Sequence, residues 1–232
     1  MNRPPNAENA GMKTRTIITT GAAVLAVGAS MGVAQLGKIK KSAEQTRDAV
    51  ERSVESVRHA AGRAADAPVY GVDKAHSTVL FKIKHAKTSN FYGRFDDIDG
   101  EWSFDPATPE SGSFSFEITT SKINTGNRKR DSHLKSADFF NSKQFPKTSF
   151  QSTSISKGEG GLYQLEGDLT LLGETRPISA ELEFLGTGNF NGPIAAFEAR
   201  FTISRSAFGM TGFEGGLGDD VSVIVAVEGP RE

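Results

Sequence analysis

The sequence predicts an all-β protein: an eight-stranded antiparallel barrel with a short plug helix, preceded by an N-terminal apolar helix and a polar helical spacer. From Val69 onward, apolar residues recur at every second position in eight separate runs. That period is typical of strands with one buried face. Clusters of Gly, Pro, Asn and Asp separate most of the runs, as expected of antiparallel hairpins. One short stretch breaks the alternation, and a long uncharged run lies near the N-terminus.

The eight runs cover residues 79–85, 98–104, 114–118, 150–154, 163–171, 178–184, 197–205 and 221–227. Closing them into a barrel would remove exposed sheet edges. The inward positions mix large residues with small ones such as Gly100, Gly167, Ala180 and Ala199. We interpret the small ones as room for one ligand inside an apolar tunnel. A packed sandwich is the alternative that the pattern leaves open.

The stretch that breaks the alternation, 130–140, has apolar residues three apart at Leu134, Ala137 and Phe140. They would share one face of a short helix, with Asp131 or Ser132 as its cap. We expect this helix to plug the barrel, and the glycine-containing segment 208–213 to act as a lid. The residues predicted for plug and lid are Asp131, His133, Leu134, Phe139, Phe140 and Phe208.

Composition excludes several classes of function. The 232-residue chain has a net charge of -1 and no basic run interleaved with aromatics, which argues against nucleic acid. It has no Cys, which excludes disulfides and thiol catalysis. Residues 1–68 hold ten Lys and Arg against six Asp and Glu, a net of +4, which leaves -5 for the rest. The two parts therefore suit separate environments.

Residues 1–37 are predicted to be a secretory signal or a membrane anchor. Thr16 to Gly37 is an uncharged run of 22 residues flanked by Lys and Arg, and about 20 apolar residues span a bilayer. Small residues at Gly32-Val33-Ala34 equally suit signal cleavage. A buried helix of a soluble protein is a third alternative. Either main interpretation places the remainder in the periplasm or elsewhere outside the cytoplasm, anchored to the membrane if the segment is retained.

Residues 38–68 are predicted to form a helical spacer, and residues 69–232 the barrel. The spacer has small apolar residues at three- and four-residue steps on a mostly polar helix. A solvated spacer and a coiled-coil stalk both fit this stripe. The sequence leaves open whether the chain forms a homodimer.

Several short motifs between residues 70 and 228 occur in an order that resembles the YceI-like family, also called polyisoprenoid-binding proteins. The matching pieces include Val72 to Ser77, Phe81 to His85, Gly100 to Pro106, Arg130 to Phe140, Phe145 to Phe150 and Ser204 to Gly209. The resemblance implies an extended lipocalin-like barrel that holds a long isoprenoid or similar amphiphile in its lumen. It implies no catalytic residues and no cofactor.

The almost wholly apolar lining predicts a lipid chain as ligand, because burying apolar surface is favourable. The predicted ligand-binding residues of the barrel lining are Phe81, Ile83, His85, Trp102, Phe116, Phe150, Leu169, Leu182, Phe201, Ile203, Arg205, Val223 and Val225. His85 and Arg205 share inward parity with apolar neighbours. They would hydrogen-bond a polar headgroup; alternatively, Arg205 pairs with a carboxylate such as Asp131 or Asp219 and fixes the plug.

The same residues argue against chemistry. Asp131 and His133 lie two apart on the predicted helix and so do not share a face, which disfavours a Ser-His-Asp triad. His76, His85 and His133 match no zinc spacing, so no metal is expected. We therefore predict a lipid carrier or store and not an enzyme. An enzyme acting on an isoprenoid, or a packed scaffold on a tethered stalk, are the alternatives.

Overall fold

The computed structural model of the protein describes residues 67–232. The predicted apolar segment and nearly all of the predicted spacer lie outside the described residues. Within residues 67–232, no helix combines the length and the apolar character that crossing a membrane requires.

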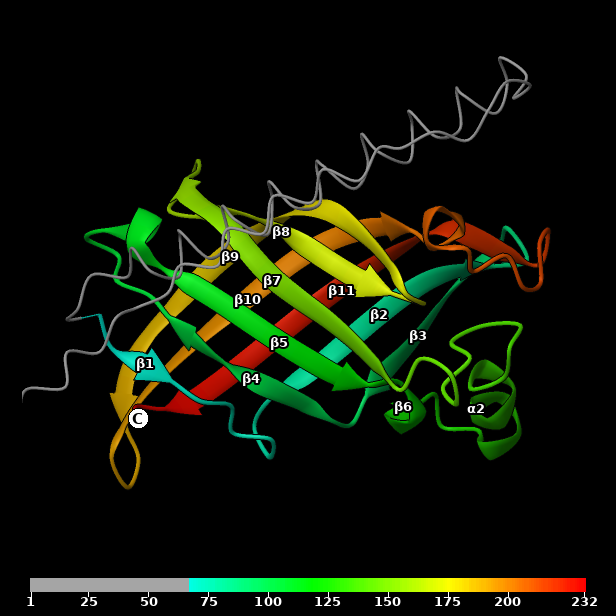
Figure 1. The fold of residues 1–232 in the computed structure, drawn as a ribbon, viewed down its shortest axis with the longest axis horizontal. Helices are drawn as coiled ribbons and strands as arrows, with labels where there is room; N and C mark the ends of the chain where they lie inside the picture. The colour runs from blue at the N-terminus through cyan, green and yellow to red at the C-terminus, as the bar shows by residue number, and fades with distance from the viewer. Residues whose placement is uncertain (1–66) are drawn as a thin grey trace, which may run out of the picture. The chain divides into compact units, whose positions relative to one another are not determined.

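The described chain forms one antiparallel sheet of eleven strands that curls into a barrel (Figure 1). Two strands are only two residues long, β1 (Val69–Tyr70) and β6 (Ile123–Asn124). The other nine are β2 (Thr78–His85), β3 (Ser89–Phe95), β4 (Ile98–Ser103), β5 (Ser113–Thr119), β7 (Lys147–Lys157), β8 (Tyr163–Leu171), β9 (Glu174–Asn189), β10 (Pro193–Ser204) and β11 (Leu217–Pro230). Their order in the sheet is β1-β4-β5-β7-β8-β9-β10-β11-β2-β3-β6. The predicted antiparallel barrel is therefore confirmed.

The strand count differs from the prediction because the short strands β1 and β6 and the longer strand β3 were not expected. The inward positions of β3 are Phe91, Gly93 and Phe95, and the glycine in the middle interrupts the apolar alternation. Phe91 and Tyr92 both lie on β3, where they pair with Ile83 and Lys82 of β2. The apolar alternation of β3 was hard to recognise in the sequence because the inward glycine has no apolar side chain.

The short strands β1 and β6 join the edges of the sheet. Tyr70 of β1 pairs with Trp102 of β4 and also bridges Arg231, which directly follows β11. At the other end, β6 follows β5 and pairs with β3 through Ile123 and Phe95. In Figure 1, β1 lies near the C-terminus and β6 lies beside the helix α2 at the opposite end. Both links reduce the unpaired backbone that an open sheet would expose.

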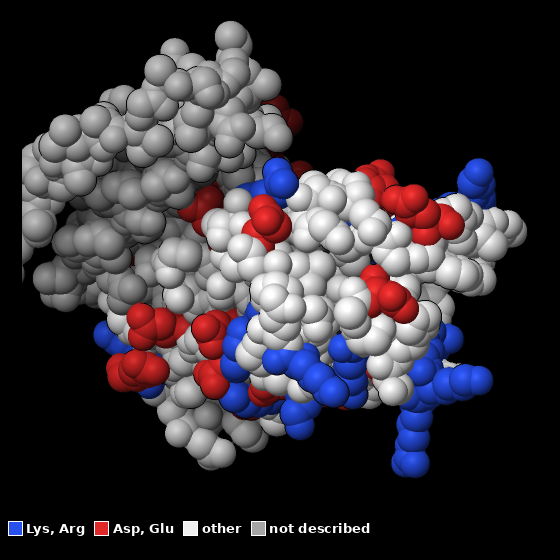
Figure 2. All heavy atoms as spheres, turned by 45° about the vertical axis from the view of Figure 1, so that its right-hand side comes forward, with Lys and Arg blue, Asp and Glu red and all other residues white. Residues whose placement is uncertain are grey.

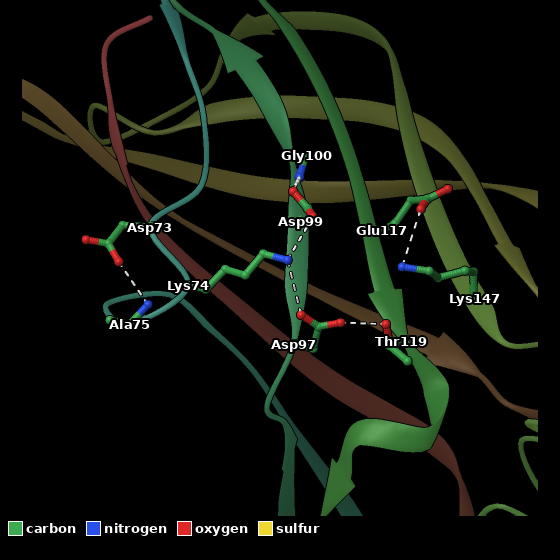
Figure 3. Close-up of polar contacts among 9 residues, drawn as sticks. All are labelled: Asp73, Lys74, Ala75, Asp97, Asp99, Gly100, Glu117, Thr119 and Lys147. Atoms are coloured by element: carbon green, nitrogen blue, oxygen red, sulfur yellow. Dashed lines mark hydrogen bonds and ion pairs between the residues drawn. The ribbon is translucent and has the colours of Figure 1, made fainter.

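A polar network on the outside connects three elements near the start of β4 (Figure 3). Lys74, from the β1–β2 connection, lies 2.8 Å from Asp99 and 3.4 Å from Asp97 between charged atoms. Thr119, at the end of β5, donates its hydroxyl to Asp97 at 2.5 Å. This hydrogen bond, with Lys74, holds the pKa of Asp97 below its ordinary value. The charged form of Asp97 therefore ties the β1–β2 connection to the ends of β4 and β5.

The plug helix starts and ends earlier than predicted. Helix α2 spans Arg128–Leu134, and its N-cap is Asn127, whose side chain accepts from the backbone of Lys129 and Arg130. Asp131 and Ser132 were the wrong caps, because Asn is an equally good cap and lies closer to the last strand residue. Residues 135–146 follow as turns, so Ala137 and Phe140 do not continue the helical face. Three short 3-10 turns complete the fold, η1 (Pro109–Ser111), η2 (Thr120–Lys122) and η3 (Ser206–Phe208).

The interior is solid at one end of the barrel. Trp102 stacks on Tyr70 with ring centroids 4.6 Å apart and meets Phe197 edge-on at 5.0 Å. Phe114 lies 5.1 Å from Phe197 in a T-shaped pair. Aromatic residues from β1, β4, β5 and β10 thus fill this half with rings that are almost completely buried. A second, smaller cluster lies under the plug and contains Phe139, Leu169, Leu171, Phe208 and Met210.

Neighbouring aromatic rings fill the space beside two inward glycines, which we had interpreted as room for a ligand. A Cβ atom on Gly167 would lie 2.3 Å from the ring of Phe150, and one on Gly100 would lie 2.7 Å from the ring of Phe116. Likewise, a Cβ atom on Gly93 of β3 would lie 2.3 Å from the ring of Phe81. These glycines therefore accommodate aromatic rings of adjacent strands, and the prediction that Gly100 and Gly167 leave the lumen open was wrong.

Candidate functional site

A cavity of about 360 Å³ occupies the half of the barrel that the aromatic cluster leaves free. Its floor is formed by Phe114, Phe197, Leu165 and Ala180, which belong to or adjoin the solid half. Its wall consists mostly of inward-facing aliphatic and aromatic residues of the strands. Of the residues predicted to line the barrel, the cavity wall includes Phe81, Ile83, His85, Phe116, Phe150, Leu169, Phe201, Ile203, Arg205, Val223 and Val225.

Trp102 and Leu182 do not line the cavity. Both have the predicted inward parity, but Trp102 is 1% exposed and Leu182 is 0% exposed within the solid half. The expected tunnel is therefore a blind cavity, closed at the end where β1 and the C-terminus lie. The reason is that five or more aromatic rings from separate strands converge there, which parity along each single strand does not reveal.

Several lining residues were missed. Phe91 and Phe95 reach the cavity from β3, and Ile98 and Ile123 reach it from β4 and β6. The alternation of Phe91, Gly93 and Phe95 was a usable signal once the glycine is counted as an inward position. Arg130 of α2 also lines the cavity, and nothing in the strand pattern could have indicated it.

Arg205 holds the segment that follows β10. It is 4% exposed, and its Nε donates to the carbonyl of Gly218 at 2.9 Å. Its Nη1 donates to the carbonyls of Met210 and Gly212, at 2.8 and 2.7 Å. The predicted pairing of Arg205 with Asp131 or Asp219 is not what the structure shows, because backbone oxygens take these donors. Arg205 therefore fixes residues 206–217 over the cavity. This segment contains the predicted lid at residues 208–213, and from here on we call the whole of it the lid.

A carboxylate anchors the lid from the outside. Asp219 accepts from the Ser204 hydroxyl at 2.5 Å and from the backbone of Ser206 at 2.9 Å. The Ser204 hydrogen bond is the main cause that lowers the pKa of Asp219 below its ordinary value. Phe208 lies buried beneath this turn and does not line the cavity, whereas Phe213 at the lid surface is 61% exposed.

The plug is held by its own polar side chains. Asp131 accepts from the backbone N–H of Thr125 at 3.0 Å and from its hydroxyl. His133 hydrogen-bonds to Asp138 at 2.9 Å between Nε2 and Oδ2, and its ring meets Phe139 edge-on. Neither Asp131 nor His133 reaches the cavity, whereas Leu134, Phe139 and Phe140 line it. The apolar plug residues thus face inward, whereas Asp131 and His133 brace the plug outside.

The end of the barrel that carries the plug is the mouth of the cavity. His85 and Ser89, paired across the β2–β3 hairpin, line the cavity there and are exposed. The helix beside them carries Arg128, Lys129 and Arg130, all exposed. In Figure 2, Lys and Arg gather in the lower half of the view, the half that holds α2 in Figure 1. The mouth therefore combines an apolar interior with a basic rim.

One group of side chains could hold a metal ion in the described part of the chain: Asp73, His76 and Glu228, whose ligand atoms lie within 4.8 Å of one another. It is on the outside, near the solid end. His76 Nδ1 hydrogen-bonds to Asp73 Oδ2 at 2.8 Å, and the other Asp73 oxygen accepts from the backbone of Ala75. Mutual hydrogen bonding lowers the pKa of Asp73 and raises that of His76. These contacts stabilise the turn before β2 without any ion.

Comparison with known proteins places these features in a wider group. The model of the YceI-like domain matches residues 70–229. Protein YceI of Salmonella newport (strain SL254) is 37% identical over 173 residues, which cover 73% of this chain and 90% of that protein. The solved YceI protein of Campylobacter jejuni is 32% identical with a TM-score of 0.57, covering 69% of this chain and 96% of the other. A polyisoprenoid binding domain from Saccharophagus degradans, 15% identical, shares the fold with a TM-score of 0.51 over 70% of this chain and 98% of that one.

Proposed function

Since the chain belongs to the YceI-like family, we propose that its barrel binds the apolar part of a long-chain amphiphile, a polyisoprenoid or a similar lipid. The observation that carries this proposal is the blind cavity of about 360 Å³ with an almost wholly apolar wall. Burial of apolar surface contributes roughly 25 cal/mol per Å², so a hydrocarbon chain gains most from entering it. The name of the Saccharophagus degradans domain, which shares the fold, states the same ligand class.

The size of the cavity limits how much of the ligand enters. Small-molecule pockets commonly measure roughly 300–1,000 Å³, and this one lies at the lower end of that range. We infer that the cavity takes the terminal units of a long chain and that the polar end stays at the mouth. The floor formed by Phe114 and Phe197 stops the chain before the solid half.

We infer carriage or storage of the lipid and no chemical conversion. The buried cation of the cavity wall, Arg205, is engaged in holding the lid, and Asp131, which lies outside the cavity, holds Thr125. The cavity also favours a binding protein over the packed scaffold that the sequence pattern left open. We place the protein outside the cytoplasm, delivered by residues 1–37, and protease treatment of intact cells tests this: cleavage of the barrel from outside supports it, and protection until lysis contradicts it.

Native mass spectrometry of the full chain as purified tests lipid binding. We expect one additional mass per barrel that is lost on extraction into organic solvent. A protein that carries no extractable mass and binds neither a polyprenol nor a polyprenyl phosphate in titration would overturn the proposal.

A further inference from the structure

Phe213, on the lid, is an exposed aromatic residue held in an unfavourable backbone conformation. Its side chain is 61% exposed, and its φ of 58° lies in the left-handed region. Gly, Asn and Asp favour this region, and a bulky residue there is an outlier. Strained positions of this kind collect at sites of binding and switching. The combination of strain and exposure therefore points to a partner that contacts Phe213.

Neighbouring residues fix the position of the Phe213 ring. Gly216 leaves the space that the ring occupies, because a Cβ atom there would overlap its Cε1 atom. The carbonyl of Gly216 accepts a hydrogen bond of 2.7 Å from the backbone N–H of Ala86, in the β2–β3 turn. On the plug side, Gly212 packs so closely on the Asp138 carbonyl that a Cβ atom would overlap it. The lid thus holds Phe213 between the β2–β3 turn and the plug, at the rim of the mouth.

The rim of the mouth is positively charged, although the barrel as a whole is not. Three segments form this rim: residues 84–90 around the β2–β3 turn, residues 127–146 with α2 and the turns after it, and the lid. Together they hold seven Lys and Arg against three Asp and Glu, a net of +4, whereas residues 69–232 carry -5. Lys87, Arg128 and Lys129 are exposed there, and the exposed acid beside Phe213 is Glu214. Positive charge is therefore concentrated at the end of the barrel where the cavity opens.

Basic residues around a protruding apolar side chain complement one kind of surface, an anionic lipid bilayer. Lys and Arg are attracted by anionic headgroups, each contributing about 1 kcal/mol near the surface. Aromatic rings favour the boundary between headgroups and acyl chains. Phe213 and the basic rim combine both features on one end of the molecule.

Phe190 is exposed as well but lacks this setting. It lies in the β9–β10 hairpin and is 68% exposed. Residues 185–194 of that hairpin contain no charged residue. The hairpin precedes β10 and the lid follows it, so the two lie at opposite ends of one strand. Figure 1 shows the lid at the end that holds α2 and the hairpin at the end near the C-terminus. Charge complementarity therefore favours the mouth.

We propose that the mouth of the barrel docks on an anionic lipid bilayer. Phe213 enters the boundary between headgroups and acyl chains, and Lys87, Arg128 and Lys129 lie against the headgroups. Docked in this way, the cavity opens toward the surface that an amphiphile would leave or enter. This inference goes beyond the proposed function, because it concerns the outer surface of the mouth and not the content of the cavity.

Single labelled cysteines in the full chain test the proposal. The natural chain has no Cys, so Thr211→Cys on the lid and Thr187→Cys on the β9–β10 hairpin each give one site for an environment-sensitive fluorophore. Both threonines are exposed. On vesicles of phosphatidylcholine and phosphatidylglycerol in equal parts, the label at residue 211 should shift to the blue and the label at residue 187 should not. Insertion of residues 1–37 into the vesicle does not affect this comparison, because only the docked end of the barrel meets the lipid.

Substitutions in the labelled Thr211→Cys chain separate the two contributions. Phe213→Ser should remove most of the blue shift, whereas the matched change Phe190→Ser should leave it unchanged. Arg128→Gln together with Lys129→Gln should weaken the contact about fivefold for each charge removed. Salt should weaken it as well, because it screens exposed charges. Vesicles of phosphatidylcholine alone should give a much smaller shift.

The docking would be overturned by any of four results: no shift at residue 211, equal shifts at both labels, a shift that survives Phe213→Ser, or an equal shift on neutral vesicles. Phe213, Arg128 and Lys129 do not line the cavity, so their variants should keep the extractable lipid seen by native mass spectrometry. A protein without extractable lipid whose label at residue 211 still shifts would contradict the proposed function and support the docking.

Discussion

Arg205 donates a hydrogen bond of 2.8 Å to the carbonyl oxygen of Met210, five residues further along the chain. Together with the bonds to Gly212 and Gly218, this contact makes one buried guanidinium the internal support of the lid. We predict that Arg205→Met lowers the free energy of unfolding by about 3–5 kcal/mol, because it leaves buried carbonyls without donors. Urea unfolding measures the loss, and hydrogen exchange should show faster opening of residues 206–217.

Arg200→Met is the control for this variant. Arg200 lies on the outer face of β10, five residues before Arg205, and its side chain is 50% exposed and contacts Glu183 and Glu198. Exposed ion pairs contribute about 1 kcal/mol or less. A loss of equal size in both variants would contradict the role of Arg205 in the lid.

An Ala→Leu substitution on β10 should affect lipid binding in the hollow half of the barrel and stability in the solid half. Ala199 lines the cavity, whereas Ala195, on the same face of the same strand, is 1% exposed in the solid half. Ala199→Leu should weaken lipid binding with little loss of stability, because the added carbons enter free space. Ala195→Leu should cost about 1–3 kcal/mol, because overpacking forces the surrounding rings to shift. Thermal unfolding compares the two, and equal destabilisation would mean that the cavity cannot accept a side chain.

The sequence predicted those features of the fold and of the cavity that depend on neighbouring residues along the chain, and missed those that depend on contacts between distant strands. Alternation located eight of the nine long strands and eleven of the thirteen predicted lining residues on the cavity wall. It could not separate Trp102 from Phe116, since both have inward parity and differ only in depth along the barrel. Depth is set by which rings of distant strands meet, and that information is spread over the whole chain.

The plug shows the same limit at short range. The sequence placed a helix near residue 130, but side-chain partners decided its details. Asn127 took the cap, and Asp131 was free to hold Thr125. Arg130 became a cavity residue only because Thr125 and Phe91 orient it. The helix could therefore be predicted, and the role of the residues on it could not.

Gly93 is predicted to control the width of the cavity through Phe81. A Cβ atom at this position would lie 2.3 Å from the Cζ atom of the Phe81 ring, so Gly93→Ala must push the ring toward the lumen. We expect a loss of about 1–3 kcal/mol in stability and weaker binding of a lipid chain. Gly188→Ala is the control, because its Cβ would meet only Ile194 at 3.4 Å or more. That variant should stay within about 0.5 kcal/mol, and an unchanged lipid affinity in Gly93→Ala would show that Phe81 does not narrow the cavity.

The Asp73–His76 hydrogen bond predicts how stability changes with pH. It raises the pKa of His76, and the nearby Glu228 acts in the same direction. The contribution of His76 is therefore complete below the ordinary histidine value of about 6.5 and is lost as pH rises through the higher pKa of the folded state. The pKa of Asp73 is lowered, so its contribution is complete above about pH 4 and is lost as pH falls through the folded value.

Between about pH 4 and pH 6.5 both groups are charged in the folded state, so the pair should stabilise most in that window. We predict that the natural protein unfolds at higher urea than His76→Gln in this range and that the difference shrinks above it. With Asp73→Asn already present, His76→Gln should change the pH profile much less, because the main partner that raises the pKa of His76 is gone and only the smaller effect of Glu228 remains. Urea midpoints of the four proteins from pH 4 to pH 9 measure this coupling. A difference that stays constant across this range would show that His76 acts through packing and not through its charge.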